Sequence, residues 1–273
     1  MANIFSIGQS ALNVAQAGVN TAGHNIANAA TPGYNRQTVV QVAGQVGAQT
    51  TGNVGMGAQV AEVKRNYSSF LGSQLLSTQS QASQLEVQHG QIQQIDNLLA
   101  DPSAGMTPAL QDFFSGVQQV ASNPSLISAR EAMISSATTL VNRFHSLDTR
   151  LGEMADEVNG KIQDAVSNIN SYATEIADLN QRIILSESTY GQPANDLLDQ
   201  RDQVLAELNK KINVSTVTAN DGSQTLFVAN SYPLVMGSKA ATLAVVADPF
   251  DSQNRQVLSV VNGGVATTID GSM

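Results

Sequence analysis

One stretch near the beginning of the chain, from Ala2 to about Thr38, organises the pattern of apolar and polar positions. Small and apolar residues recur there at alternating steps of three and four, in two parallel sets. Such a repeat is typical of a helix that packs lengthwise along another helix. The first set, the predicted assembly seam, consists of Phe5, Gly8, Leu12, Ala15, Val19, Ala22 and Ile26. The second set consists of Ile4, Ile7, Ala11, Val14 and Gly18.

The same stretch is almost free of charge. In residues 1–61 the only Lys, Arg, Asp or Glu is Arg36, although an isolated amphipathic helix normally carries a charged outer face. Internal glycines also weaken its helix propensity. The sequence therefore predicts a helix that is marginal alone and needs partners around much of its circumference. Periodicity alone also allows an ordinary helix docked on its own domain.

A turn and two extended segments are predicted next. Pro32 biases Thr31 away from the helical region, and Pro32-Gly33 suits the central positions of a type II turn. Residues 37–42 and 58–63 are rich in β-branched side chains, so they predict a loose β-excursion between two helical zones. The glycines at 52–57 lack the spacing of a phosphate-binding loop, which favours a flexible arm.

Three helices are predicted between residues 67 and 187. The first, over 67–99, has an apolar face made of Leu71, Leu75, Ala82, Leu85, Ile92 and Leu99. The second begins with Thr107 as N-cap and Pro108 at the first helical position. The third, over about 128–187, would be a rod of roughly 90 Å, with a stutter beside Gly160 that predicts local unwinding of a supercoil. Its predicted bundle core comprises Leu140, Phe144, Leu147, Leu151, Ile169, Ile176 and Ile183.

A last helix is predicted over 195–212, with Asp196, Asp199 and Asp202 in its opening turns. Three carboxylates suggest a metal site, but acidic residues near a helix N-terminus are favoured by the helix dipole in any case. From Asn213 onward, short β-branched segments separated by Gly, Pro and Asn predict an antiparallel β region. The pattern stops directly after a strand, so we expect this region to be incomplete and the chain to be about the first half of a longer protein.

These elements predict a mainly α fold with an appended β module. At 273 residues the chain has room for one large or two to three small domains. We expect an N-terminal core helix with a Gly-rich extended arm (1–65), a helical bundle with a long coiled helix (66–212) and the start of a β domain (213–273).

Composition excludes several classes of function. The chain has 13 basic and 22 acidic residues, a balance that disfavours nucleic acid as a partner. It has no Cys, which excludes disulfides, thiolate catalysis and Cys-based metal sites. No apolar run is long enough for a membrane span, and the N-terminus lacks the basic segment and apolar core of a cleaved signal peptide.

No pattern in the sequence indicates catalysis. The three histidines, His24, His89 and His145, are scattered, and the chain has no P-loop, nucleophile elbow or HExxH motif. Packing accounts for all the long periodic segments. We therefore predict a protein that is not an enzyme and has no catalytic residues, no cofactor and no bound metal.

The residues of the predicted turn resemble those of a known family. The run NIANAATPGYNR at 25–36 resembles the N-terminal signature of the bacterial flagellar axial proteins, which build the rod, hook and hook-associated zones. A second run, ANDLLDQRD at 194–202, resembles a stretch of the hook-associated members of that family. The residues that match the signature are Asn25, Asn28, Thr31, Pro32, Gly33, Tyr34 and Arg36.

This resemblance implies a structural subunit of the extracellular flagellum that self-assembles at the hook–filament junction by helix packing. It implies as partners further copies of the chain, the hook subunit, the next hook-associated protein and an export chaperone. It also implies export without signal cleavage, and a C-terminal helix, expected beyond Met273, that pairs with the first helix. Hook or distal rod proteins are the nearest alternative, and a secreted coiled-coil adhesin or translocator is the alternative from a different class.

Overall fold

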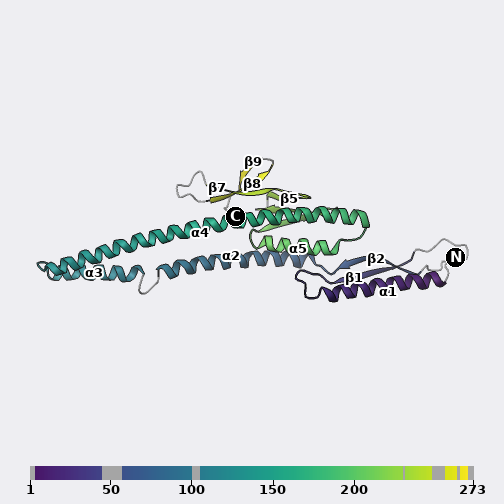
Figure 1. The fold of residues 1–273 in the computed structure, drawn as a ribbon, viewed down its shortest axis with the longest axis horizontal. Helices are drawn as coiled ribbons and strands as arrows, with labels where there is room; N and C mark the ends of the chain where they lie inside the picture. Colours follow the sequence, from purple (N-terminus) through teal and green to yellow (C-terminus); the bar gives the residue numbers. More distant parts are fainter. Residues whose placement is uncertain are drawn as a thin grey trace. The chain divides into compact units, whose positions relative to one another are not determined.

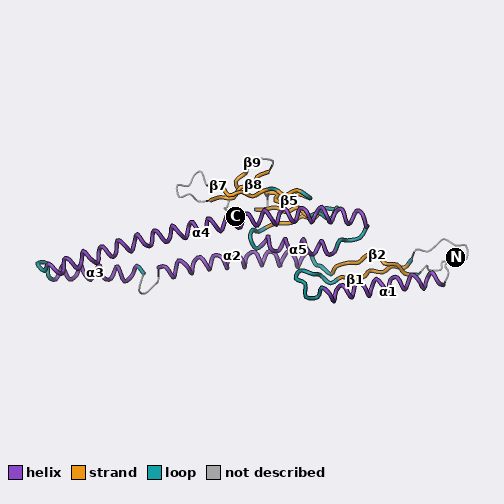
Figure 2. Tube along the Cα trace, in the orientation of Figure 1, coloured by secondary structure: helices purple, strands orange, loops and turns teal. Residues whose placement is uncertain are grey.

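The computed structural model describes residues 4–44, 57–99, 105–229, 231–247, 256–262 and 265–269. Within these ranges, no helix combines the length and the apolar character that a membrane span requires. Long helices make up most of the described chain, and the strands form short antiparallel sheets (Figure 2). Along the sequence, one two-stranded sheet lies between the first two helices, and the other sheets follow the last helix. The prediction of a mainly α fold with an appended β module is therefore confirmed.

The helices of the described ranges match those that apolar periodicity predicts (Figure 1). They are α1 Ile4–Ala27, α2 Ser69–Leu99, α3 Met106–Ser122, α4 Ile127–Tyr190 and α5 Asn195–Asn209. Some boundaries differ from the prediction, because α5 ends at Asn209, three residues before Ile212, and the N-cap of α3 is Gly105 and not Thr107. Pro108 still lies in the first turn, where a backbone N–H has no partner within the helix and its loss costs little. After α4, Gly191 adopts a left-handed φ of 62°, as residues that end a helix commonly do.

The strands form three small antiparallel sheets in the described ranges. A two-stranded ribbon consists of β1 Gln37–Ala43 and β2 Ala58–Arg65. A four-stranded sheet consists of β3 Val214–Thr218, β4 Gln224–Val228, β5 Tyr232–Met236 and β6 Lys239–Ala240. A three-stranded sheet consists of β7 Thr242–Ala247, β8 Gln256–Asn262 and β9 Val265–Thr268. Strand β6 is not predicted from the sequence, because two residues carry no readable alternation.

The chain divides into two compact units. The first comprises Met1–Ser80, Val166–Val246 and Val257–Met273, and the second comprises Gln81–Ala165 and Ala247–Gln256. This division cuts across the three ranges expected from composition, because α2 and α4 each contribute residues to both units. The expected ranges therefore mark changes in the character of the sequence and do not coincide with the compact units.

The core of the first unit is built from helices and sheets together. It comprises Val166, Ile169, Ala173, Ile176, Ala177, Leu205, Leu208, Val214, Leu226, Val228, Leu234, Val235, Leu243, Val260 and Ile269. The buried face of α4 is wider than the single row of residues in a coiled-coil seam. Ala173 and Ala177 are buried on it beside Ile169 and Ile176. A face of this width suits a sheet better than a single helix. The β strands therefore provide much of the core that the sequence assigns to a helical bundle.

The predicted bundle core is only partly correct. Its buried members are Leu147, Ile169, Ile176 and Ile183. Leu140 is half-buried, whereas Phe144 and Leu151 are 52% and 44% exposed. These two side chains are therefore not part of a core in the described chain. The apolar face predicted for α2 is also open, since α2 has no buried residue.

Gly160 lies within α4, which continues through it as one helix. No atom lies within 4 Å of the position that a Cβ would occupy there. We expect Gly160→Ala to raise the free energy of unfolding by up to about 1 kcal/mol, because alanine has the higher helix propensity. Thermal unfolding followed by circular dichroism measures this change. A lower melting temperature would show that the glycine is needed for a bend or a close contact.

Candidate functional site: the junction between the signature turn and helix α5

The turn after α1 has the geometry that its Pro-Gly pair predicts. Gly33 has a φ of 78°, which glycine adopts without strain. The backbone N of Tyr34 donates to Thr31 O at 3.2 Å, the bond that closes a four-residue turn. A Cβ on Gly33 would lie 3.2 Å from the Cβ of Gln203 on α5. The turn therefore packs directly on α5, and both its φ and the available space favour glycine.

Asn25 ties the end of α1 to the start of β1. Its Nδ2 donates to Gln37 O and its Oδ1 accepts from Gln37 N, both at 2.8 Å. The side-chain amide thus pairs with the backbone N–H and C=O of Gln37 in the way that a residue of a neighbouring strand would. Tyr34 Oη donates to the same Oδ1 at 2.7 Å. Burial and the charges of Asp196 and Asp199 raise the pKa of Tyr34, which keeps this hydroxyl protonated at neutral pH.

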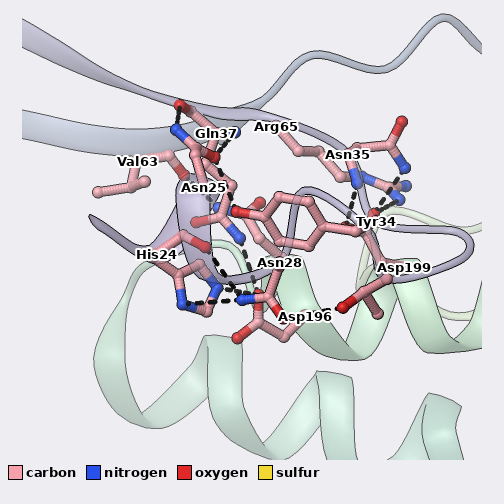
Figure 3. Close-up of polar contacts among 12 residues, drawn as sticks. His24, Asn25, Asn28, Tyr34, Asn35, Gln37, Val63, Arg65, Asp196 and Asp199 are labelled. Atoms are coloured by element: carbon pink, nitrogen blue, oxygen red, sulfur yellow. Dashed lines mark hydrogen bonds and ion pairs between the residues drawn. The ribbon is translucent and has the colours of Figure 1, made fainter. Parts of the chain in front are cut away.

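Asp196 on α5 receives two side chains from the N-terminal segment (Figure 3). Its Oδ1 lies 3.2 Å from His24 Nε2 and 2.8 Å from Gln37 Nε2. His24 Nδ1 lies 3.4 Å from Asn28 Nδ2, and its ring meets the Tyr34 ring edge-on, with centroids 5.5 Å apart. Because an amide nitrogen only donates, this arrangement fits the imidazole tautomer with its proton on Nε2.

Asp199 and Asp202, one and two turns further along α5, bind the turn and β2. Asp199 accepts from Asn35 N and Asn35 Nδ2, each at 2.8 Å, and from Arg65 Nη1 at 2.9 Å. The same Nη1 lies 2.6 Å from Asp202 Oδ2, and the guanidinium lies 4.3 Å from the centroid of the Tyr67 ring. The side chains of Arg65, Asp199 and Asp202 are only 12%, 7% and 16% exposed.

The buried charges in this cluster depend on one another. Burial raises the pKa of Asp202, and the neighbouring Arg65 opposes that effect. Burial lowers the pKa of Arg65, but Asp202 and Asp199 outweigh it and leave the pKa of Arg65 above its ordinary value. A charge removed from water is tolerated when a partner of opposite sign compensates it. Loss of Arg65 would therefore leave Asp199 and Asp202 buried without their shared cation.

The signature residues have different places in this arrangement. Asn25, Asn28 and Tyr34 are half-buried and make the bonds just described. Residues 31–33 are exposed and form the turn itself. The side chain of Arg36 is also exposed, and among the described residues it has neither a hydrogen bond nor an ion pair. The guanidinium of Arg36 thus makes no polar contact that would stabilise the junction.

The predicted assembly seam lies on the exposed side of α1. Leu12, Val19 and Ile26 are 71%, 71% and 77% exposed, and Phe5, Ala15 and Ala22 are exposed too. The second apolar set contributes half-buried residues on the side of the β1–β2 ribbon, where Ser10 Oγ accepts from Ala58 N at 3.2 Å. The helix has no buried residue, so one face contacts the ribbon and the other is open.

The sequence did not reveal the partners of the turn. The spacing of Asp196, Asp199 and Asp202 places them on one face of α5, and this signal suggested a metal. In the structure their oxygens instead accept from the N-terminal segment, and Arg65 is separated from Asp199 by 134 positions in sequence. No local pattern indicates a pairing over that distance.

The junction offers no obvious place for a metal or cofactor. Among the described residues, no group of three or more His, Asp or Glu side chains could hold a metal ion. A groove of about 600 Å³ beside the junction is lined by residues of α1, β1, β2 and α5, and Asp196 is the one charged residue in that lining. Because Asp196 already faces His24 and Gln37, the groove presents no free charged group for chemistry.

Comparison with known proteins identifies the family. Residues 92–273, which include α5, match the family model described as the flagellar hook-associated protein FlgK helical domain. The chain belongs to the flagellar hook-associated protein FlgK family. This match confirms the resemblance to flagellar axial proteins and the choice of their hook-associated members.

Relatives within the FlgK family extend the match. The chain is 40% identical over 253 residues to flagellar hook-associated protein 1 of Salmonella typhimurium, covering 91% of this chain and 46% of that protein. It is 37% identical over 264 residues to the Escherichia coli protein of the same name, covering 96% of this chain and 48% of that protein. The solved structure of the flagellar hook junction protein FlgK from Burkholderia pseudomallei superimposes with a TM-score of 0.62 at 31% identity, over 69% of this chain and 33% of that one. The chain thus spans about half the length of the curated FlgK relatives it matches.

Proposed function

We propose that the chain is part of a structural subunit of the bacterial flagellum that assembles at the hook–filament junction by helix packing. The observation that carries this proposal is the exposed row of Leu12, Val19 and Ile26 on α1. A contiguous apolar face on a segment whose one charged residue is Arg36 is typical of a surface that other protein covers. The names of the relatives, hook-associated protein 1 and hook junction protein FlgK, support the location.

In the proposed mechanism, α1 enters an inner layer formed with neighbouring subunits, and the junction sets the direction in which the chain leaves that layer. The polar bonds of the junction suit this role, because α1 buries no residue of its own. Its orientation relative to α5 therefore depends on the turn at Gly33, on the pairing of Asn25 with Gln37 and on the carboxylates of α5. An error in the turn would misdirect α1 without disturbing the core of the β module.

The remaining elements of the proposal come from the family. The partners are further copies of the chain, the hook subunit and the next hook-associated protein, with an export chaperone before assembly. The location is the extracellular flagellum, reached without cleavage of a signal peptide. The subunit acts by packing and not by catalysis, and it needs no cofactor.

Leu12→Asp and Val19→Asp test the seam. In a strain that lacks the full-length protein, we expect each variant to be exported normally but to leave filaments unattached, because assembly would bury an unpaired carboxylate at a cost of several kcal/mol. The melting temperature of the isolated protein should change little, since exposed substitutions usually alter stability by no more than about 0.5 kcal/mol. Motility, exported protein and attached filaments are the measurements.

A matched control separates burial from added charge. Asn13 is exposed and lies about 100° around the helix from Leu12, so Asn13→Asp adds the same carboxylate outside the seam. We expect this variant to restore filaments. If both seam variants were exported and restored filaments to the wild-type level, α1 would not be an assembly surface.

A further inference from the structure

Arg36 is a signature residue whose side chain forms no hydrogen bond or ion pair within the described part of the chain. Asn25, Tyr34 and Asn35 make hydrogen bonds within the junction, and Gln37 reaches Asp196. The guanidinium of Arg36 is exposed and has no partner among the described residues. It is also the one charged residue in 1–61, a segment that otherwise avoids charge. An exposed cation with no ion pair in the described chain is available to a partner outside it.

The β1–β2 ribbon places a second cation beside it. Gln37 pairs with Arg65 and Thr38 pairs with Lys64, and Asn66 N donates to Arg36 O at 2.8 Å. Because side chains alternate along a strand, Gln37 and Arg65 share the face that binds α5, while Arg36 and Lys64 share the opposite face. Lys64 is exposed and without an ion pair in the described chain. Diagonal neighbours of this kind stand roughly 7–8 Å apart.

We propose that Arg36 and Lys64 form a docking surface for two carboxylates on α4 of a second copy of this chain. The proposal rests on the proposed function, since it names one contact by which the subunits assemble. Glu62 lies on the same face as Lys64, opposite Val40, and is half-buried. It offsets part of the charge, so the surface keeps a modest positive excess that suits paired carboxylates.

Charge complementarity within the chain supports a second copy as the partner. Residues 1–65 contain three basic residues and one acidic residue, whereas the whole chain has 13 basic and 22 acidic residues. The excess of acid therefore lies elsewhere, and α4 presents exposed carboxylates three residues apart at Glu153 and Asp156 and again at Glu175 and Asp178. None of the four has an ion pair in the described chain. Side chains at this spacing lie about 5–6 Å apart at Cβ, so the flexible side chains of Arg36 and Lys64, roughly 7–8 Å apart, can each reach one of them.

The form of this contact also fits an assembly. Two different surfaces of one chain that complement each other make a heterologous, head-to-tail interface. Such an interface repeats from subunit to subunit and builds a ring or a helical array, whereas a self-complementary surface stops at a dimer. A basic surface on the ribbon and an acidic surface on α4 therefore suit a tubular structure.

Charge reversal measures the contribution of the docking surface. In the full-length protein we expect Arg36→Glu to lower the number of attached filaments about tenfold, because the new carboxylate would face like charges across the interface, and such a juxtaposition weakens association. Export and the melting temperature of the monomer should not change. Lys211 is also exposed and has no ion pair in the described chain, so Lys211→Glu is the matched control and should assemble normally. Equal assembly of the two variants would overturn the proposal.

A zero-length cross-linking reagent, which joins a lysine amine directly to a nearby carboxylate, identifies the partner of Lys64. One copy keeps Lys64 but has Glu153, Asp156, Glu175 and Asp178 replaced by amides, and the other carries Lys64→Arg with α4 intact. In junctions assembled from both copies, a link from Lys64 to one of these four positions can form only between copies, and we expect mass spectrometry to find it at one of the two carboxylate pairs. Links from Lys64 only to a different flagellar protein, or none while other lysines react, would overturn the proposal. If the seam variants Leu12→Asp and Val19→Asp block attachment in the same assays, the proposed function stands even when this contact fails.

Discussion

Asn180→Leu is expected to lower the free energy of unfolding by about 3–5 kcal/mol. Asn180 is fully buried on α4. Its Nδ2 donates to Gln224 O and Gly237 O, each at 2.8 Å. Its Oδ1 accepts from Gln224 N at 3.1 Å and from Arg201 Nη1 at 2.9 Å. Leucine has nearly the same shape, so the loss would come from the polar groups left without partners.

The position of Arg201 makes this loss severe. Arg201 on α5 is 2% exposed, and besides Asn180 its Nη1 donates to Gly222 O at 2.7 Å. Burial lowers the pKa of Arg201, and Asp202 opposes that effect. Removing the Asn180 oxygen would leave a buried cation less compensated, which is costly. One amide thus joins α4, α5, the start of β4 and the turn between β5 and β6.

Urea unfolding followed by circular dichroism measures the effect of Asn180→Leu. Gln181→Leu is the matched control, because Gln181 is the neighbouring amide on α4 but is exposed. We expect the control to change stability by no more than about 0.5 kcal/mol. Equal stability of the two variants would show that the network around Asn180 does not hold the sheet to the helix.

Arg65→Met is expected to lower the free energy of unfolding at neutral pH by about 3–5 kcal/mol, as broken buried ion pairs commonly do. The variant leaves Asp199 and Asp202 buried side by side with no cation between them. Hydrogen exchange should show where the loss falls, because the bonds from α5 to the turn and β2 depend on this cluster. We expect faster exchange in α1 and the β1–β2 ribbon and little change in the β3–β6 sheet.

The pH dependence of this loss follows from the pKa of Asp202. That pKa is already above its ordinary value because of burial, and removing Arg65 would raise it further. A carboxyl whose pKa is higher in the folded than in the unfolded state favours folding when protonated, so the deficit of Arg65→Met should shrink as the pH falls from about 7 to about 5. Lys64→Met, at the neighbouring exposed position of β2, is the control and should show no such deficit. A deficit that stayed constant or grew toward acid pH would contradict the role of the carboxylates.

Some of the junction could be read from residues that act locally. The turn at Pro32-Gly33 depends on the φ preferences of two adjacent residues, so its position and its left-handed glycine follow from the sequence. The helices follow from apolar periodicity over many residues, which averages out single exceptions. The end of α3 at Asn123 is local for the same reason, whereas its start at Gly105 was missed because several residues there satisfy the rules for an N-cap.

The partners of buried polar groups could not be read in this way. Asp199 binds Asn35 and Arg65, and Asn180 binds Gln224 at the start of β4, over separations of 164, 134 and 44 positions. A hydrogen bond depends on distances of a few tenths of an ångström, and no periodicity along the chain encodes such a distance. The three aspartates of α5 were noticed from the sequence, but only the fold showed which protein groups their oxygens accept from.

The sequence by itself determined the helices, the strands other than β6, the signature turn and the family, because each depends on residues close together in the chain. Only the tertiary structure decided which apolar faces are covered. The same three-four repeat occurs on α1 and α4, yet Leu12 and Val19 are exposed while Ile176 and Ile183 are buried. Periodicity specifies that a helix has an apolar face, but what covers that face depends on elements brought there by the rest of the chain, or by another subunit.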